Sequence, residues 1–305
     1  MNKRKLFQWA VLGYMMLAGL TACSGDDDAT DMPDDGVKVR RMTITQTDNA
    51  AVRQMLTRAT LTEDDGITAS WTTGDRLTYC NLSRTNPSDD DVYSGPLTAT
   101  SSAATSQFTG DVACRQGDYL AVVYPATTFE TNESYTISLA GQDGTLGTLA
   151  TNYHYVYGKA YVTSVTDNTA NATMEKMKSL LTVCKFSFVD KTTGNAIAIC
   201  SLTIGYGGSG SDADTYPQEA TVAVSPSTPM ADIHATGATG GSKVLTVSLT
   251  AAQGAVYVTL LPTNGQRTFR FTVTDDSGNT YSGTAKATLT EGDYVVATGL
   301  KLTKN

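Results

Sequence analysis

The chain has 305 residues and a formal net charge of −8, from 22 basic and 30 acidic side chains. An acidic protein repels phosphate backbones, so we do not expect a nucleic acid as a partner. The length suffices for one large or two medium domains, and no apolar run after residue 22 is long enough to cross a membrane.

Residues 1–22 have the pattern of a secretory signal peptide. The positive cluster Lys3–Lys5 precedes an uncharged apolar stretch, residues 6–22, which is short for a membrane span with a soluble body behind it. The segment Leu20–Cys23 follows, in which a leucine and two small residues precede a cysteine. It resembles the lipobox of bacterial lipoproteins, which implies lipid attachment at Cys23 after removal of residues 1–22. The alternative is an ordinary signal peptide whose cleavage site happens to precede a cysteine.

Residues 23–36 are predicted to form a disordered tether. They include the acidic run Asp26–Asp28 and three further aspartates, and they contain too few apolar side chains to fold. An acidic run directly after a lipid-bearing cysteine resembles the export signal that sends some lipoproteins to the outer face of the outer membrane. A solvated spacer without an address is the alternative.

From residue 37 onward the sequence predicts an all-β fold. Short runs rich in Val, Thr and Tyr alternate with turns that contain Gly, Asn and Asp, as in β-sandwiches. We expect the segment Thr193–Asn195 to close a hairpin and short helices to occur only at residues 49–56 and 174–180. The clearest predicted strands are residues 67–71, 76–82, 119–124, 135–139, 153–163, 180–189, 196–204, 243–249, 255–261, 268–274, 280–289 and 294–303.

The polar, turn-rich residues 164–171 indicate a domain boundary. We therefore expect two β-sandwich domains in tandem, the N-terminal one at residues 37–165 and the C-terminal one at residues 172–305. In the N-terminal domain Trp71 ends a predicted strand, and its ring is expected to cap the core.

In the first and last predicted strands, the alternation of side chains indicates which residues share a face. In the first strand, the apolar residues before Arg40–Arg41 and those after it have opposite parity, which predicts a bulge at this pair. In the last strand, residues 294–303, the alternation assigns one face to Tyr294, Val296, Leu300 and Leu302.

The cysteines that follow the anchor leave two possibilities open. An even number in an exported chain permits two disulfides, but no pair has the Cys-x-x-Cys spacing of metal or redox sites. The apolar surroundings of Cys184 and Cys200 favour buried free thiols. The four residues are Cys80, Cys114, Cys184 and Cys200.

No sequence pattern indicates catalysis or a cofactor. His154 and His234 lie in separate segments and lack a metal-binding spacing. The glycine-rich residues 205–210 lack the Lys-Ser/Thr ending of a phosphate loop, and no nucleophile elbow is present. We therefore expect that the protein is not an enzyme and uses no cofactor or metal.

Four short segments occur in a characteristic order: TRAT at residues 57–60, SWTTGDRL at 70–77, LAVVYP at 120–125, and GDY at 292–294 before the last strand. Together they resemble the fimbrillin family, the type V pilins and Mfa-like surface lipoproteins of Bacteroidales-type bacteria. The resemblance implies two transthyretin-like β-sandwich domains and a structural role in cell-surface fimbriae that support adhesion.

The resemblance also implies a route of assembly. In fimbrillins a surface protease cuts after an arginine and releases the first strand, and a strand of a neighbouring pilin, commonly from its C-terminal end, fills the groove. The bond Arg58–Ala59 matches the family's cut site best, and Arg41 and Arg53 match it less well. The candidate donor strand is residues 294–303, or its neighbour at 280–289. The implied partners are other fimbrial subunits, the processing protease, and the outer membrane through the lipid.

A second function is open, that of a monomeric surface lipoprotein that binds a glycan or a host protein. Tyr153, Tyr155 and Tyr157 alternate along a predicted strand, and sugar rings stack on aromatic faces of this kind. The same stripe also suits packing within a sheet. For a fimbrial subunit, the roles of stalk, tip and anchor are all open.

Overall fold

The computed structural model describes residues 37–47, 60–63, 67–84, 93–131, 133–175, 177–208, 213–226, 232–236 and 244–305. They belong to the unit Gly36–Asn305. The predicted signal peptide and tether, Cys23, the helix expected at residues 49–56 and the bond Arg58–Ala59 lie outside the described residues, so what we expect of them stays a prediction.

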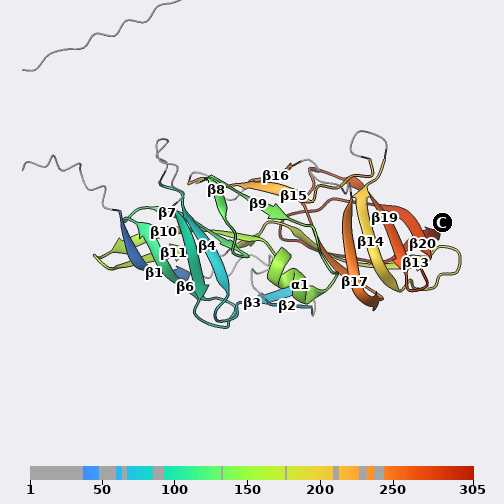
Figure 1. The fold of residues 1–305 in the computed structure, drawn as a ribbon, viewed down its shortest axis with the longest axis horizontal. Helices are drawn as coiled ribbons and strands as arrows, with labels where there is room; N and C mark the ends of the chain where they lie inside the picture. Colours follow the sequence, from blue (N-terminus) through green and yellow to red (C-terminus); the bar gives the residue numbers. More distant parts are fainter. Residues whose placement is uncertain are drawn as a thin grey trace, which may run out of the picture. The chain divides into compact units, whose positions relative to one another are not determined.

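The structure consists almost wholly of strands, which confirms the predicted all-β fold class (Figure 1). A short helix α1 (Leu146–Thr148) and a π-helical turn η1 (Leu149–Tyr153) lie between β9 and β10. The helix expected at residues 174–180 is wrong, because this segment continues into strand β12, whose residues pair with β10. The strands are β1 (Lys38–Gln46), β2 (Thr60–Glu63), β3 (Ile67–Ser70), β4 (Arg76–Asn81), β5 (Ser94–Ala99), β6 (Gln107–Cys114), β7 (Tyr119–Tyr124), β8 (Phe129–Thr131), β9 (Ser134–Ser138), β10 (Val156–Val165), β11 (Thr169–Met174), β12 (Lys178–Ser179), β13 (Thr182–Asp190), β14 (Ile199–Tyr206), β15 (Glu219–Ala223), β16 (Asp232–Thr236), β17 (Leu245–Gln253), β18 (Val256–Leu260), β19 (Arg267–Asp275), β20 (Thr280–Ala287) and β21 (Tyr294–Lys304).

The first sheet closes on itself into a barrel. Its strand order is β11-β1-β6-β5-β4-β7-β10-β12, and an additional pairing of β10 with β11 joins its two sides. Trp71 lies in the apolar interior with 1% of its surface exposed, and its ring meets those of Phe108 and Tyr124 edge-on, at centroid distances of 4.9 and 5.5 Å. The expected core position of Trp71 is confirmed. Gly74, with a φ of +95°, makes the turn from Trp71 into β4.

The second sheet has the order β17-β14-β19-β20-β21-β13-β18. The turn around Thr193–Asn195 forms as expected, and Val189 and Ala196 make an isolated bridge across it. The predicted hairpin does not extend further, because β13 pairs with β18 and β21 whereas β14 pairs with β17 and β19. β13 and β14 therefore form longer ladders with strands distant in the sequence than they form with each other.

Strands from the two halves of the chain also pair with each other. β9 and β15 are neighbours in a four-stranded sheet of order β16-β15-β9-β8, and one apolar cluster contains residues of both halves. β11 and β12 belong to the first sheet, so the strands of that sheet extend beyond residue 165 to Ser179. The division into domains at residues 165 and 172 stays a prediction.

Candidate functional site

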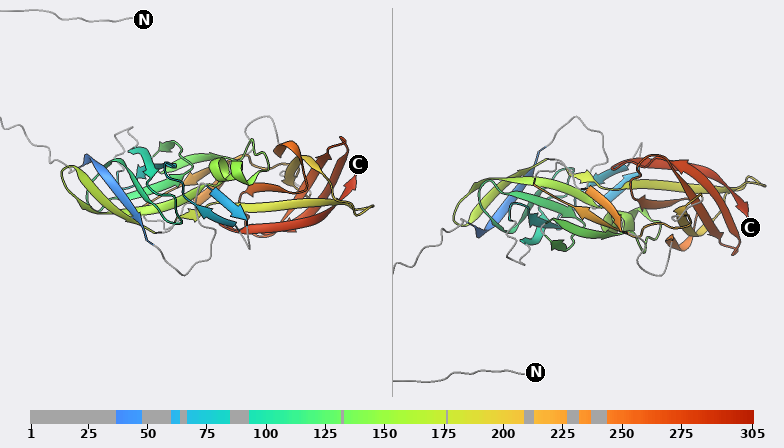
Figure 2. Two further views of the ribbon diagram at one scale, coloured as in Figure 1. Left: turned by 90° about the horizontal axis from the view of Figure 1, so that it is seen from below. Right: turned by 90° about the horizontal axis from the view of Figure 1, so that it is seen from above.

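Strand β1 closes the barrel between β6 and β11. It pairs antiparallel with β6 along Lys38–Thr45 and parallel with β11 along Arg41–Gln46. Figure 2 shows β1 in blue beside the yellow-green β11. Because both edges of β1 are paired, its removal would expose one edge of β6 and one edge of β11. Among the described strands, β1 alone precedes the predicted cut at Arg58.

The predicted bulge at Arg40–Arg41 is wrong. The register of β1 with β6 is continuous, and the inward side chains alternate from Arg40 through Met42 to Ile44. Met42 and Ile44 are fully buried and Arg40 is 6% exposed, whereas Val39 is 68% exposed. The prediction failed because the alternation of apolar side chains was read with Val39 in the core and Arg40 in solvent. The arginine can be buried because hydrogen-bond acceptors surround its guanidinium.

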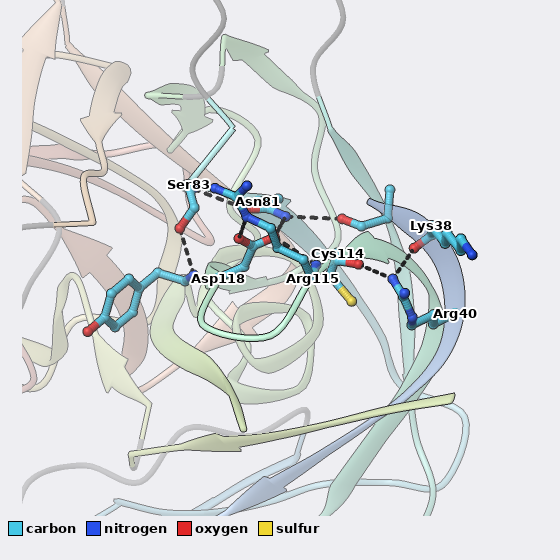
Figure 3. A network of polar contacts seen from close by, with 9 residues as sticks. Lys38, Arg40, Asn81, Ser83, Cys114, Arg115 and Asp118 are labelled. Carbon is cyan, nitrogen blue, oxygen red and sulfur yellow. Dashed lines mark hydrogen bonds and ion pairs between the residues drawn. The ribbon is translucent and has the colours of Figure 1, made fainter. Parts of the chain in front are cut away.

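Backbone oxygens hold the Arg40 guanidinium. Its Nε donates to the carbonyl oxygen of Thr166 at 2.7 Å. Its Nη1 donates to the carbonyl oxygen of Cys114 and, at 3.3 Å, to that of Lys38 (Figure 3). Thr166 lies in the turn between β10 and β11 and Cys114 ends β6, so Arg40 ties β1 to both of its neighbours at one end of the barrel. We call the carbonyl oxygens of Cys114 and Thr166 the Arg40 cage.

A buried carboxylate holds the loop after β6 in place. Asp118, with 2% of its side chain exposed, accepts hydrogen bonds from the backbone N–H of Arg115 at 3.0 Å and from Asn81 Nδ2 at 2.8 Å (Figure 3). Arg115 Nε donates to the second carboxylate oxygen at 3.3 Å. Asn81 Nδ2 also donates to the carbonyl oxygen of Ala113 at 3.0 Å. These bonds fix the end of β6, and with it one of the two oxygens of the Arg40 cage.

None of the four described cysteines forms a disulfide, so neither of the two bridges that the sequence permitted is present. Cys80, Cys114 and Cys184 are buried, and Cys200 is half-buried. Burial raises the pKa of Cys80 to about 12 and also raises the pKa of Cys114 and of Cys184. The buried thiols therefore stay protonated at neutral pH and pack as small apolar side chains.

A bulge interrupts β21 (Tyr294–Lys304). Its register with β13 shifts between Ala297 and Leu300, where β21 has one residue more than its partner. Gly299 lies at this position with a φ of +67°, a backbone conformation that residues other than glycine rarely adopt. The bulge reverses the parity of the strand.

The four residues of the candidate donor strand consequently do not share one face. Leu302 is 1% exposed and Leu300 packs against the same core, whereas Val296, before the bulge, is 54% exposed. Tyr294 lies on the same side as Val296. The predicted single face is wrong because one extra residue changes the side to which later residues point. The role of these residues as a donor strand stays a prediction.

β21 pairs with β13 along most of its length but with β20 only near its end. The ladder described between β20 and β21 joins Tyr281 to Lys304 and Ser282 to Thr303. Residues of both strands also line a cavity of about 180 Å³, whose apolar lining includes Phe186, Phe271, Leu289, Ala297 and Leu300. One edge of β21 therefore makes few ladder hydrogen bonds with a neighbouring strand.

Glu63, the last residue of β2, binds three side chains of the second sheet. Lys185 Nζ lies 2.9 and 2.8 Å from its two carboxylate oxygens, Tyr294 Oη donates to it at 2.5 Å, and Tyr257 Oη also donates to it. These hydrogen bonds, that of Lys185 above all, lower the pKa of Glu63 to about 2. We call these four residues the Glu63 cluster. It fixes β2 beside β13, as Figure 2 also shows.

We expect Glu63→Gln to destabilise the protein in a pH-dependent way. The folded pKa of about 2 lies below the ordinary value of 4.5, so the stabilisation is complete above the unfolded pKa and is lost as the pH falls towards the folded pKa. The difference in unfolding free energy between wild type and Glu63→Gln should therefore be largest at neutral pH and should shrink between about pH 5 and pH 2.

Urea unfolding at a series of pH values measures this difference. Glu133→Gln is a matched control, because Glu133 is exposed in the turn between β8 and β9. Its difference from wild type should stay small at every pH. A Glu63→Gln difference that is independent of pH would contradict the assigned role of the carboxylate.

The tyrosines proposed as a glycan platform do not form one. Tyr153 lies in η1 and donates to the carbonyl oxygen of Ala140 at 2.8 Å, Tyr155 donates to that of Ser138 at 2.9 Å, and Tyr157 is 4% exposed. The stripe predicted from alternation is broken because the strand begins only at Val156.

The two histidines lie in different elements of the fold. His154 is buried before β10, and His234 is in β16. Within the described ranges, no three His, Cys, Asp or Glu side chains gather so that they could hold a metal ion. In the same ranges no helix is both long and apolar enough to cross a membrane.

Arg40 and Glu63 were not predicted as site residues from the sequence. For Arg40 a signal exists, because its parity matches that of Met42 and Ile44 and an unbroken strand would place all three inside. For Glu63 none exists, since its partners come from three strands that lie far from it in the sequence.

The described fold is similar to solved structures of two candidate cell adhesion proteins. The protein from Bacteroides uniformis is 14% identical, with a TM-score of 0.51 over 90% of this chain and 98% of that chain. The protein from Bacteroides ovatus is 12% identical, with a TM-score of 0.53 over 88% of this chain and 96% of that chain. No protein-family model and no curated protein matches the sequence. The chain therefore shares its fold with these two Bacteroides proteins.

Proposed function

We propose that the protein is a subunit of a cell-surface fimbria, either the repeating pilin or a minor component, and that it supports adhesion. It is exported to the outer membrane as a lipoprotein with lipid on Cys23. A protease then cuts Arg58–Ala59, β1 leaves, and a strand of another subunit takes its place. This role is structural and requires no catalysis. The fimbrillin-like segments of the sequence and the fold shared with two candidate cell adhesion proteins support it.

The position of β1 is the observation that carries this proposal. β1 is paired along both edges, and Met42 and Ile44 fill the barrel core. A barrel without β1 has two unpaired strand edges and an apolar groove, which together form a template for another strand. Strand addition restores the main-chain hydrogen bonds and the buried side chains together.

The Glu63 cluster supports the same proposal. Cleavage at Arg58–Ala59 would make β2 the new N-terminal strand, and Glu63 ties β2 to the second sheet. Only the chain before the cut would then be free to leave. The lipid anchor belongs to that released part, so the cut also frees the subunit from the membrane.

The N-terminus of the protein on cells tests this function. We expect wild-type protein in the fibre fraction to begin at Ala59, and protein in the membrane fraction to begin at a lipidated Cys23. Arg58→Ala should keep the Cys23 start and should remove most of the oligomers that resist mild denaturation. Mass spectrometry of the N-terminal peptide and denaturing gels measure the two outcomes.

Arg53→Ala is the control, because Arg53 matches the family's cut site less well. It should leave both the start at Ala59 and the oligomers unchanged. If Arg58→Ala changes neither the N-terminus nor the oligomers, the assembly proposal is wrong. A wild-type chain found only with lipidated Cys23 would instead support the monomeric surface lipoprotein that binds a glycan or a host protein.

A further inference from the structure

The groove that β1 occupies has a polar end and an apolar middle. The side chains that point into it are, in order, the cation of Arg40, the apolar Met42 and Ile44, and the amide of Gln46. The Arg40 cage forms the polar end, and Trp71 and Phe108 belong to the core cluster around the apolar middle. A strand that replaces β1 must match this order of side chains.

The backbone of the groove does not decide the direction of an incoming strand. β1 is antiparallel to β6 and parallel to β11, so β6 and β11 run in opposite directions. An incoming strand forms one parallel and one antiparallel ladder whichever way it enters. Its side chains must therefore set its direction.

The Arg40 cage provides such a side-chain requirement. The carbonyl oxygens of Cys114 and Thr166 belong to β6 and to the β10–β11 turn, so they stay in place when β1 leaves. An acidic or apolar side chain at this position would leave the two oxygens without a charged donor.

The end of β21 meets this requirement in one direction only. Read backwards, Lys304, Leu302 and Leu300 repeat the order of a cation and two apolar side chains with the spacing of β1. Read forwards, Lys301 precedes Thr303 and Asn305, and neither is apolar. The neighbouring strand β20 offers Lys286, which precedes threonines at 288 and 290.

We propose that the Arg40 cage selects the incoming strand by binding a basic side chain, and that the strand is the β21 end of a second copy, with Lys304 in the place of Arg40 and a direction opposite to that of β1. Leu302 then takes the place of Met42, and Leu300 that of Ile44. Both leave the core of the donor's own second sheet, where the end of β21 has only a short ladder with β20. This inference rests on the proposed strand exchange and on the donor strand that the fimbrillin resemblance implies, and it adds the direction of that strand and the selectivity of the groove.

Substitution of Lys304 tests the selectivity without disturbing the donor's own fold. Lys304 is exposed, whereas Leu302 is buried in its own sheet and a charged residue there would unfold it. After cleavage with an arginine-specific protease, Lys304→Glu should assemble into denaturation-resistant oligomers at least about tenfold more slowly than wild type. Lys304→Arg should assemble like wild type. Lys301→Glu is the matched control, since Lys301 has the opposite parity, and it should assemble within about twofold of wild type.

Thiol cross-linking between copies tests the direction. In the proposed direction Asn305 takes the place of Val39, opposite Ala113. In the direction of β1, with Leu302 again in the place of Met42, it would take the place of Thr45, opposite Gln107. In a Cys200→Ser background, which removes the half-buried thiol, Asn305→Cys should therefore form an intermolecular disulfide with Ala113→Cys and not with Gln107→Cys.

The outcomes separate this inference from the proposed function. Cut wild-type protein that forms no oligomers overturns the strand exchange and the inference with it. Oligomers that form equally well with Lys304→Glu overturn the role of the Arg40 cage and leave the exchange standing. Oligomers that cross-link through Gln107→Cys overturn the proposed direction.

Discussion

Trp71→Ala is expected to lower the free energy of unfolding by about 3–5 kcal/mol, the range typical of a buried aromatic residue replaced by alanine. Trp71 is 1% exposed and fills the barrel core against the rings of Phe108 and Tyr124. The substitution removes this buried apolar surface and leaves a cavity that strands paired on both sides cannot collapse to fill. Urea unfolding followed by circular dichroism measures the loss.

Trp71→Phe separates the ring contacts from the cavity. Phenylalanine keeps an aromatic ring near Phe108 and Tyr124, and it removes an indole N–H that has no hydrogen-bond partner among the described residues. We therefore expect a loss of only about 1–2 kcal/mol. Equal losses for the Ala and Phe variants would contradict the assignment of Trp71 to a closely packed core.

Trp71 and the strands near it were predictable because their signals are local. The predicted strand at residues 119–124 coincides with β7, and Gly74 makes the turn that follows Trp71. Alternation of side chains and turn residues act within a few positions, so one sequence suffices to find them. The pairing of β9 with β15 was not predictable, since it depends on which distant edges meet when two sheets fold.

The parity of the first and last strands was the part of the candidate site for which the sequence prediction failed. The sequence indicates that the first and last strands matter, yet the parity rule put Arg40 in solvent and gave β21 a single face. Both errors have the same origin, because the rule assumes an unbroken strand and an apolar interior. At Gly299 the strand has one extra residue, and at Arg40 the interior is lined by carbonyl oxygens.

The same contrast leads to a prediction for two neighbouring arginines. We expect Arg40→Met to lower the free energy of unfolding by about 2–4 kcal/mol and Arg41→Met to lower it by no more than about 0.5 kcal/mol. Methionine keeps the length and apolar stem of arginine, so the loss at Arg40 reports mainly the hydrogen bonds to Thr166 and Cys114. Relief from burying the guanidinium offsets part of that loss. Arg41 makes a surface ion pair with Asp111 at 3.4 Å, and both side chains are more than half exposed.

The fluorescence of Trp71 can report the difference between the Arg40 and Arg41 variants, because Trp71 lies in the barrel core beside β1. The sequence has two tryptophans, and Trp9 lies in the predicted signal peptide, so a chain without residues 1–22 carries Trp71 alone. Trp71 shares its core cluster with Met42 and Ile44 of β1, and its emission should therefore respond when β1 leaves the barrel. After cleavage at Arg58, Arg40→Met should release β1 faster than wild type, since the cage no longer holds it. Equal unfolding energies and equal release rates for the Arg40 and Arg41 variants would show that the cage does not hold the strand, and the selectivity inferred for its replacement would then lose its basis.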